Sequence, residues 1–142
     1  MIKEASSADE IMRCFPVMSE LRPHLDESKF TSLVLDMFQE GFRLAYLEKD
    51  GAVRCVAGFR ITTTLFMGKN LYVDDLVTDD SHRSEGHGKA MLAWLRKLAL
   101  ASDCDYLHLD SGTQRQRAHK FYLAENMMIT AFHFAEKLQK KK

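Results

Sequence analysis

The chain has 142 residues, enough for one domain with a single buried core. Its 20 basic and 20 acidic residues balance, so the composition implies no general attraction to nucleic acid or to an anionic membrane. No apolar run approaches the roughly 18 residues of a membrane span, and the start lacks the apolar core of a signal peptide, so we expect a soluble cytoplasmic protein.

The first predicted elements are a short strand at residues 2–5 and a helix. Ser7 and Glu10 have the spacing of a capping box, in which the two side chains bond backbone N–H groups at the start of a helix. Pro16 lies inside the apolar pattern of this helix and lacks a backbone donor, which predicts a kink or an early stop. Pro23 ends the segment for the same reason.

A second helix and a β-hairpin follow. Apolar residues recur at helical spacing over residues 30–38, with Asp26 as the candidate N-cap and Gly41 as the stop. Residues 42–61 change to an alternating pattern, which is interrupted by Asp50-Gly51, a pair typical of tight hairpin turns. Two antiparallel strands are therefore expected here.

The next predicted strand, residues 71–78, departs from alternation in its middle. Asp74 and Asp75 are adjacent, so one of them would face the apolar side of the sheet unless the strand bulges. We predict a bulge at this point, which would interrupt the ladder and leave backbone groups free for a ligand.

The last part of the chain predicts four more elements. The face from Met91 to Ala99 indicates a helix, which is followed by a strand at residues 106–109, a helix at residues 114–125 and a closing strand at residues 129–138. No linker, repeat or low-complexity segment interrupts the sequence, so residues 1–142 are predicted to form a single domain.

The joint between the strand at residues 71–78 and the following helix reads Arg-Ser-Glu-Gly-His-Gly, residues 83–88. Gly86 and Gly88 let backbone N–H groups approach a ligand at the positive end of that helix, which predicts an anion cradle, most naturally for phosphate. A dinucleotide fingerprint would need a third glycine where Met91 stands, and the Gly-Lys-Ser or Gly-Lys-Thr of a P-loop is missing.

This Arg-x-x-Gly-x-Gly sequence after a strand rich in Leu and Val resembles motif A of the GNAT superfamily of N-acetyltransferases. A second match lies downstream, where Arg115-x-x-Ala118-x-x-x-Tyr122 and then Asn126 are similar to the family's Asn-x-x-Ala-x-x-x-Tyr followed by Gly-Phe. Arg115 departs from the family Asn, whereas Asn126 suits a turn with positive φ nearly as well as Gly.

The order of predicted elements is also that of the GNAT fold. The resemblance therefore implies an α/β fold of the α+β kind, in which about four helices flank a mixed, mostly antiparallel sheet of six to seven strands.

The resemblance implies acetyl-CoA as the cosubstrate. In this family the pantetheine arm pairs with the backbone of the fourth strand, and the pyrophosphate binds the glycine loop. The implied coenzyme contacts are Leu76, Val77, Thr78, Arg83, Ser84, Glu85, Gly86, His87, Gly88 and Lys89.

The implied reaction is direct attack by a primary amine of a small molecule or peptide on the thioester, in a ternary complex. The amine, with a pKa of about 10, needs a base or a water chain, and the departing thiolate benefits from a proton. Tyr122 is the candidate acid, with a core-facing structural tyrosine as the alternative. Asp75 is preferred to Asp74 as the base, with a structural role or a water chain as the alternatives.

The acceptor is not encoded in a recognisable motif. Glu20, Arg22, His24 and Asp26, near the junction of the first two helices, could select a charged acceptor, although solvated loop residues look the same.

The histidines follow no zinc or iron motif, so no metal is expected. His119 and His133 could line the acceptor cleft, but a lone histidine is more often packed or exposed. The three cysteines are widely spaced and odd in number, which favours free thiols in a reducing compartment.

Three alternatives remain open: a different acyl donor, a hydroxyl acceptor, or a noncatalytic coenzyme A sensing module of the same fold. An exposed strand edge near the C-terminus could support a homodimer.

Overall fold

The computed structural model describes residues 1–141 and contains two compact units, Met1–Leu109 and Asp110–Lys142. The first unit holds nine elements, which are β1 (Ile2–Glu4), α1 (Ala8–Leu21), α2 (Glu27–Phe38), β2 (Phe42–Lys49), β3 (Ala52–Thr64), β4 (Gly68–Thr78), the short 3₁₀ helix η1 (Asp80–His82), α3 (His87–Ala101) and β5 (Tyr106–Leu109). The second unit holds the helix α4 (Gln116–Ala124).

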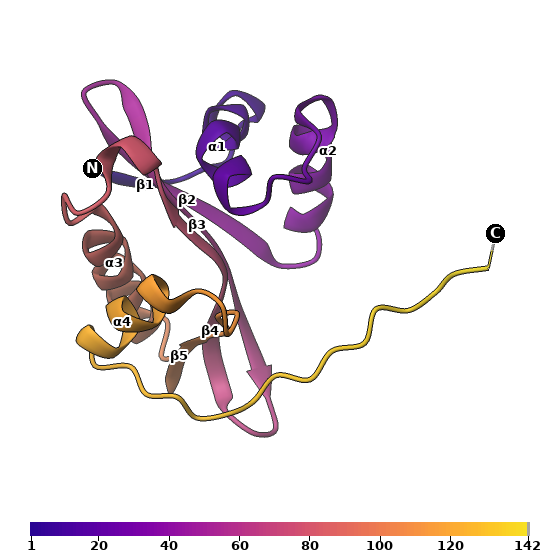
Figure 1. Ribbon diagram of the computed structural model, residues 1–142, viewed down its shortest axis with the longest axis vertical. Helices are drawn as coiled ribbons and strands as arrows, with labels where there is room; N and C mark the ends of the chain where they lie inside the picture. Colours follow the sequence, from indigo (N-terminus) through magenta and orange to yellow (C-terminus); the bar gives the residue numbers. More distant parts are fainter. Residues whose placement is uncertain (142) are drawn as a thin grey trace. The chain divides into compact units, whose positions relative to one another are not determined.

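The five strands form one mixed sheet in the order β1-β2-β3-β4-β5. The first four strands pair antiparallel, and β5 pairs parallel with β4. Helices cover both faces of this sheet, with α1 and α2 on one side and α3 on the other (Figure 1). The first unit is therefore a three-layer structure with a core on each face of the sheet.

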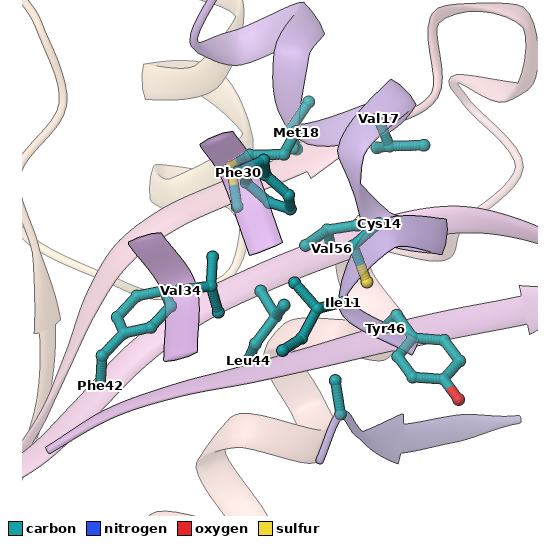
Figure 2. Packing of buried hydrophobic residues seen from close by; sticks show 12 residues of the cluster. Ile11, Cys14, Val17, Met18, Phe30, Val34, Phe42, Leu44, Tyr46 and Val56 are labelled. Carbon is teal, nitrogen blue, oxygen red and sulfur yellow. The ribbon is translucent and has the colours of Figure 1, made fainter. Parts of the chain in front are cut away.

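Alternation along β2 divides its side chains between the two cores. Leu44 and Tyr46 pack under α1 and α2, whereas Ala45 and Leu47 pack against α3. Figure 2 shows the first of these cores, in which side chains of both helices meet the sheet.

The N-terminal half follows the predicted local signals, except at Pro16. Ser7 and Glu10 form the predicted capping box of α1. The predicted early stop at Pro16 does not occur, because α1 continues to Leu21. Val17, directly after the proline, is buried in the core, so the helix continues to contribute apolar contacts beyond Pro16.

The hairpin and the bulge are both confirmed. Asp50 and Gly51 have positive φ angles of 55° and 78°, as a tight turn between β2 and β3 requires. On β4, Asp75 pairs with Gly58 while Val73 pairs with Phe59. Asp74 therefore has no partner of its own across the ladder, which is the predicted bulge.

The predicted number of strands is wrong, because the sheet has five strands and not six to seven. The predicted closing strand at residues 129–138 has no ladder partner among residues 1–141, and its large apolar side chains are exposed, with Phe132 at 85% and Phe134 at 91%. Alternation gives such a segment one apolar face, but a strand also requires a neighbour that accepts its backbone hydrogen bonds.

Within residues 1–141, no helix is long and apolar enough to cross a membrane.

Candidate active site

The bulge in β4 determines the surroundings of Asp75. Arg22, at the end of α1, donates from Nε to the Asp75 carboxylate at 2.9 Å and from Nη2 to the backbone carbonyl of Asp74 at 3.0 Å. The Asp74 carboxylate instead pairs with Arg60 on β3 at 3.1 Å. Burial raises the pKa of the Asp75 carboxyl above its ordinary value, and the ion pair with Arg22 offsets only part of this effect. The bulge thus gives two adjacent carboxylates different partners.

Because Gly58 has no side chain, the Asp75 carboxylate can occupy the space beside it. A Cβ atom at position 58 would lie 2.5 Å from the Asp75 carboxylate oxygen Oδ2 and 2.5 Å from the ring of Phe42. Real Cβ contacts are not this short, so any larger residue at position 58 would displace one of these groups. The absence of a side chain at position 58 is therefore a condition for this placement of Asp75.

Asp75 also lines a cavity of about 350 Å³ on the α1 and α2 side of the sheet. The other lining residues come from α1, α2, β2 and the loop between the two helices, and are Met18, Arg22, His24, Leu25, Phe30, Leu33, Val34, Met37, Phe42 and Leu44. Two of the four residues considered for acceptor selection, Arg22 and His24, line this cavity. The other two do not: Glu20 accepts a hydrogen bond from the backbone of Asp80, and Asp26 caps α2.

The part of β4 after the bulge extends beyond its neighbour. Among residues 1–141, β5 pairs with β4 only from Asn70 to Val73. Residues 76–78 pair with β3 on their other side. Because β5 ends opposite Val73, the backbone edge of residues 76–78 lies past the end of this parallel pair, at the position predicted for the pantetheine arm.

The glycine loop leads directly into α3. Gly86 is the N-cap of this helix, with a φ of 85°, and it supplies no side-chain cap. The first turn of α3 contains no acidic residue, whereas the first turns of α1 and α2 do. Side chains also cap those two helices, Ser7 at α1 and Asp26 at α2. The first N–H groups of α3 are thus left without a protein side chain as cap, as an anion-binding helix terminus requires.

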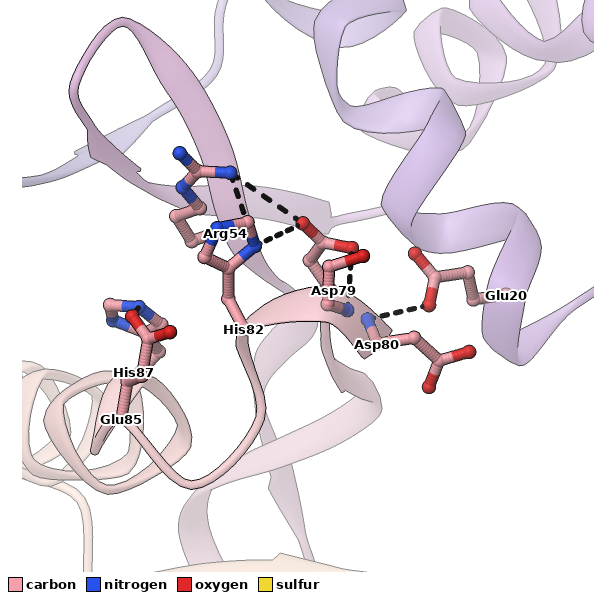
Figure 3. Close-up of polar contacts among 8 residues, drawn as sticks. Glu20, Arg54, Asp79, Asp80, His82, Glu85 and His87 are labelled. Carbon is pink, nitrogen blue, oxygen red and sulfur yellow. Dashed lines mark hydrogen bonds and ion pairs between the residues drawn. The ribbon is translucent and has the colours of Figure 1, made fainter.

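Acidic groups beside this loop have cationic or imidazole partners (Figure 3). His82 Nδ1 lies 2.8 Å from the Asp79 carboxylate, and Arg54 lies 3.7 Å from it. The hydrogen bond with His82 lowers the pKa of the Asp79 carboxyl. Glu85 lies 3.3 Å from the buried His87 ring. The carboxylates of Asp79 and Glu85 are therefore partly neutralised by these partners, next to the N–H groups at the start of α3.

The remaining predicted contacts in the loop differ in exposure. Arg83 pairs with Asp80 at 2.7 Å, but 44% of its side chain is exposed. Ser84 has a φ of 67°, which turns the chain toward Gly86. Lys89 is exposed on the first turn of α3. Both basic side chains reach the surface, where Lys89 could contact a ligand anion directly and Arg83 would do so in exchange for Asp80.

The second unit contains the downstream motif. Tyr122 lies on α4, next to the ring of Phe121, and Arg115 is the N-cap residue of this helix. Asn126 has a φ of 67°, so the turn after α4 does require the left-handed conformation inferred for that position. His119 contacts the carbonyl of Gly112 at 2.7 Å.

Two residues of this site were not among the sequence-predicted site residues. Gly58 and Arg60 lie within residues 42–61, which the sequence marks only as an alternating strand pattern, yet they determine where Asp75 and Asp74 lie. A glycine inside a strand is the one local signal that could have drawn attention to this close approach. Within residues 1–141, no cluster of His, Cys, Asp or Glu is suited to hold a metal ion.

Comparisons with known proteins agree with this fold and loop. Residues 6–126 match the model of the acetyltransferase (GNAT) family. The chain is 34% identical over 122 residues to YhdJ, an uncharacterized N-acetyltransferase of Bacillus subtilis (strain 168), with 85% of this chain and 86% of that protein covered.

Solved structures share the fold at low sequence identity. A ribosomal-protein-alanine N-acetyltransferase from Brucella melitensis biovar Abortus 2308 superposes with a TM-score of 0.83 at 14% identity, over 97% of this chain and 99% of that chain. The aminoglycoside N-acetyltransferase AAC(6')-Iy, in complex with CoA, gives 0.84 at 12% identity, over 99% and 95%.

The structure is an α/β protein with an uncapped helix terminus after a glycine loop, and its family follows from the match to the family model and from the similarity to YhdJ. The chain belongs to the GNAT family of acetyltransferases and is an acetyl-CoA-dependent acyltransferase.

Proposed function

We propose that the protein transfers the acetyl group of acetyl-CoA to a primary amine of a small molecule or peptide, by direct attack in a ternary complex. The observation that carries this proposal is the position of Asp75, which lines a cavity and immediately precedes residues 76–78 on β4. An amine in the cavity would thereby be near both a carboxylate and the strand edge proposed for pantetheine.

The coenzyme would extend from the strand edge to the glycine loop. We assign the pantetheine arm to the backbone of Leu76, Val77 and Thr78, and the pyrophosphate to the N–H groups at residues 84–88. Arg83 and Lys89 would add positive charge from exposed side chains.

Asp75 would accept the proton of the attacking amine. A protonated primary amine, with a pKa of about 10, has no lone pair for attack, so a carboxylate or a water held by it must remove the proton. The neutral nitrogen then attacks the thioester carbonyl and a tetrahedral intermediate forms. Its nitrogen releases the second proton to water as the carbon–sulfur bond breaks. Tyr122 would donate a proton to the departing coenzyme A sulfur, since a phenol stays protonated at neutral pH.

A comparison of tyrosine variants tests this function. Turnover is measured as coenzyme A thiol released in the presence of a panel of amines. The Tyr122→Phe variant should lose about 10-fold to 100-fold in kcat with little change in acetyl-CoA affinity. Tyr106→Phe is the matched control, because Tyr106 is a half-exposed phenol on β5. Unchanged turnover in Tyr122→Phe would overturn the assignment of the acid.

The chief alternative is a coenzyme A sensing module without turnover. It would bind acetyl-CoA but release no thiol with any amine in the panel, whereas acetylation of even one amine rules it out. An amine acceptor is favoured by the related structure of AAC(6')-Iy, which was solved with a bisubstrate analogue of coenzyme A and acetylneamine.

We also propose that the protein forms a homodimer through residues 129–138. This segment is extended and exposes Ile129, Phe132, Phe134 and Leu138. In light scattering, the double variant Phe132→Ser/Phe134→Ser should be monomeric, and the control Phe66→Ser, which changes an 89% exposed residue of the first unit, should remain dimeric. A monomeric parent protein would contradict the proposal.

A further inference from the structure

The cavity beside Asp75 is mostly apolar. Eight of its eleven lining residues are apolar, and they come from α1, α2, β2 and the loop between the helices. Figure 2 shows five of them, Met18, Phe30, Val34, Phe42 and Leu44, where the two helices meet the sheet. A volume of about 350 Å³ lies at the small end of the range of ligand pockets in proteins.

The polar lining of the cavity carries little net charge. Asp75 is its one acidic lining residue within residues 1–141, and this carboxylate is already paired with Arg22. The neighbouring Asp74 is paired with Arg60 and does not line the cavity. A ligand with several positive charges would therefore find no set of unpaired carboxylates here, and its additional ammonium groups would lose hydration without compensation.

These observations point to one class of acceptor. We infer that the substrate is a small primary monoamine with an apolar alkyl or aryl body, which fills this cavity and presents its nitrogen to Asp75. The inference rests on the proposed acetyl transfer and adds the acceptor's chemical class. Apolar contacts would select the body of the acceptor, and the single carboxylate would select the amine.

The apolar lining predicts that kcat/KM depends on the length of the alkyl chain of the amine. Primary alkylamines share a pKa near that of lysine, ~10.4, so their protonation does not change along a homologous series. Each methylene transferred from water into an apolar site should improve kcat/KM about fourfold until the cavity is full. A site in open solvent would show no such increase.

The test measures kcat/KM for n-alkylamines from ethylamine to hexylamine, together with phenethylamine and a polycationic amino sugar. We expect about a fourfold rise per methylene over at least three steps, and the amino sugar should be the poorest acceptor. A flat series, or a preference for the amino sugar, would overturn the inference.

Two leucines on α2 supply a matched pair of variants. Leu33 and Leu35 are 44% and 41% exposed, so neither is needed for the core, but only Leu33 lines the cavity. Leu33→Gln should lower kcat/KM for hexylamine at least about fivefold and leave ethylamine nearly unchanged, because only the longer chain reaches the apolar wall. Leu35→Gln should behave as the parent with both amines. Equal effects of the two variants would contradict the assignment of the cavity.

Calorimetric titration separates failure of this inference from failure of the proposed function. If acetyl-CoA binds and amines are acetylated without any dependence on chain length, the inference alone is wrong. If no amine is acetylated, the proposed transfer is wrong, and hexylamine binding to the coenzyme A-saturated protein still tests the cavity. In that case Leu33→Gln should weaken hexylamine binding and Leu35→Gln should not, while absence of hexylamine binding would overturn the inference as well.

Discussion

At the scale of single residues, Asp75 combines a partly buried carboxylate, a fixed cationic partner and access to a cavity. Burial raises its pKa above the ordinary value of 3.8, although Arg22 acts in the opposite direction. The proton-accepting form of Asp75 is the carboxylate, which predominates above this raised pKa. Turnover should therefore fall as the pH is lowered through the pKa of Asp75.

The Asp75→Asn variant tests this role. It keeps the size of the side chain but cannot accept a proton, so kcat/KM should fall about 100-fold or more, and its loss at low pH should disappear. The affinity for acetyl-CoA should stay within about twofold. Asp36→Asn, an exposed change on α2, is the control and should leave kcat/KM unchanged. A kcat/KM of Asp75→Asn within threefold of the parent would leave only a structural role for this residue.

At the scale of elements, the start of α1 is stabilised by an ionised glutamate. Glu10 accepts hydrogen bonds from the Tyr46 hydroxyl at 2.7 Å and from the backbone N–H groups of Ser6 and Ser7 at 3.1 and 3.2 Å. These bonds lower the pKa of Glu10 from 4.5 to about 2, with the Tyr46 bond as the largest cause. A lowered pKa in the folded state means that this stabilisation is complete above pH 4.5 and is lost as the pH falls toward about 2.

Urea unfolding at several pH values tests whether stability falls at low pH as predicted. The free energy of unfolding of the parent should decrease between pH 4.5 and pH 2, and Glu10→Gln should show a smaller decrease over the same interval. At neutral pH the variant should be less stable by about 0.5–1.5 kcal/mol, because a neutral amide replaces the carboxylate that accepts these charge-assisted hydrogen bonds. Glu27→Gln, in the first turn of α2, is the control. Parallel pH profiles for the parent and Glu10→Gln would contradict this account of α1.

Elements with local causes were predictable from the sequence. The capping box, the Asp50-Gly51 turn and the bulge at Asp74 each depend on residues within a few positions of one another. The strand expected at residues 129–138 was wrong, and of the kink or early stop expected at Pro16 the early stop does not occur. Burial and ladder pairing depend on partners far away in sequence.

At the scale of the whole molecule, the glycine loop and the cavity beside Asp75 differ in how far the sequence reveals them. The loop is continuous, so its glycines and the following helix are visible in the sequence. The cavity instead requires α1, α2, β2 and β4 to meet, and its Arg22–Asp75 pair joins residues 53 positions apart. No local pattern predicts this pair, and the glycine within the strand is the one local signal for the clearance at Gly58.

The start of α3 is proposed to bind the pyrophosphate of acetyl-CoA. Gly86 and Gly51 form a matched pair for its test, since both have positive φ, at 85° and 78°, and both have open space where a Cβ would stand. An aspartate at either position adds the same charge and a similar backbone cost, but only at position 86 would it cap α3 and repel a bound phosphate.

The most direct measurement is therefore calorimetric titration of acetyl-CoA into the parent, Gly86→Asp and Gly51→Asp. We predict that Gly86→Asp raises the Kd at least tenfold, equivalent to about 1.4 kcal/mol, and that Gly51→Asp leaves it within about twofold of the parent value. Equal affinities for all three proteins would contradict the assignment of the pyrophosphate to this helix terminus.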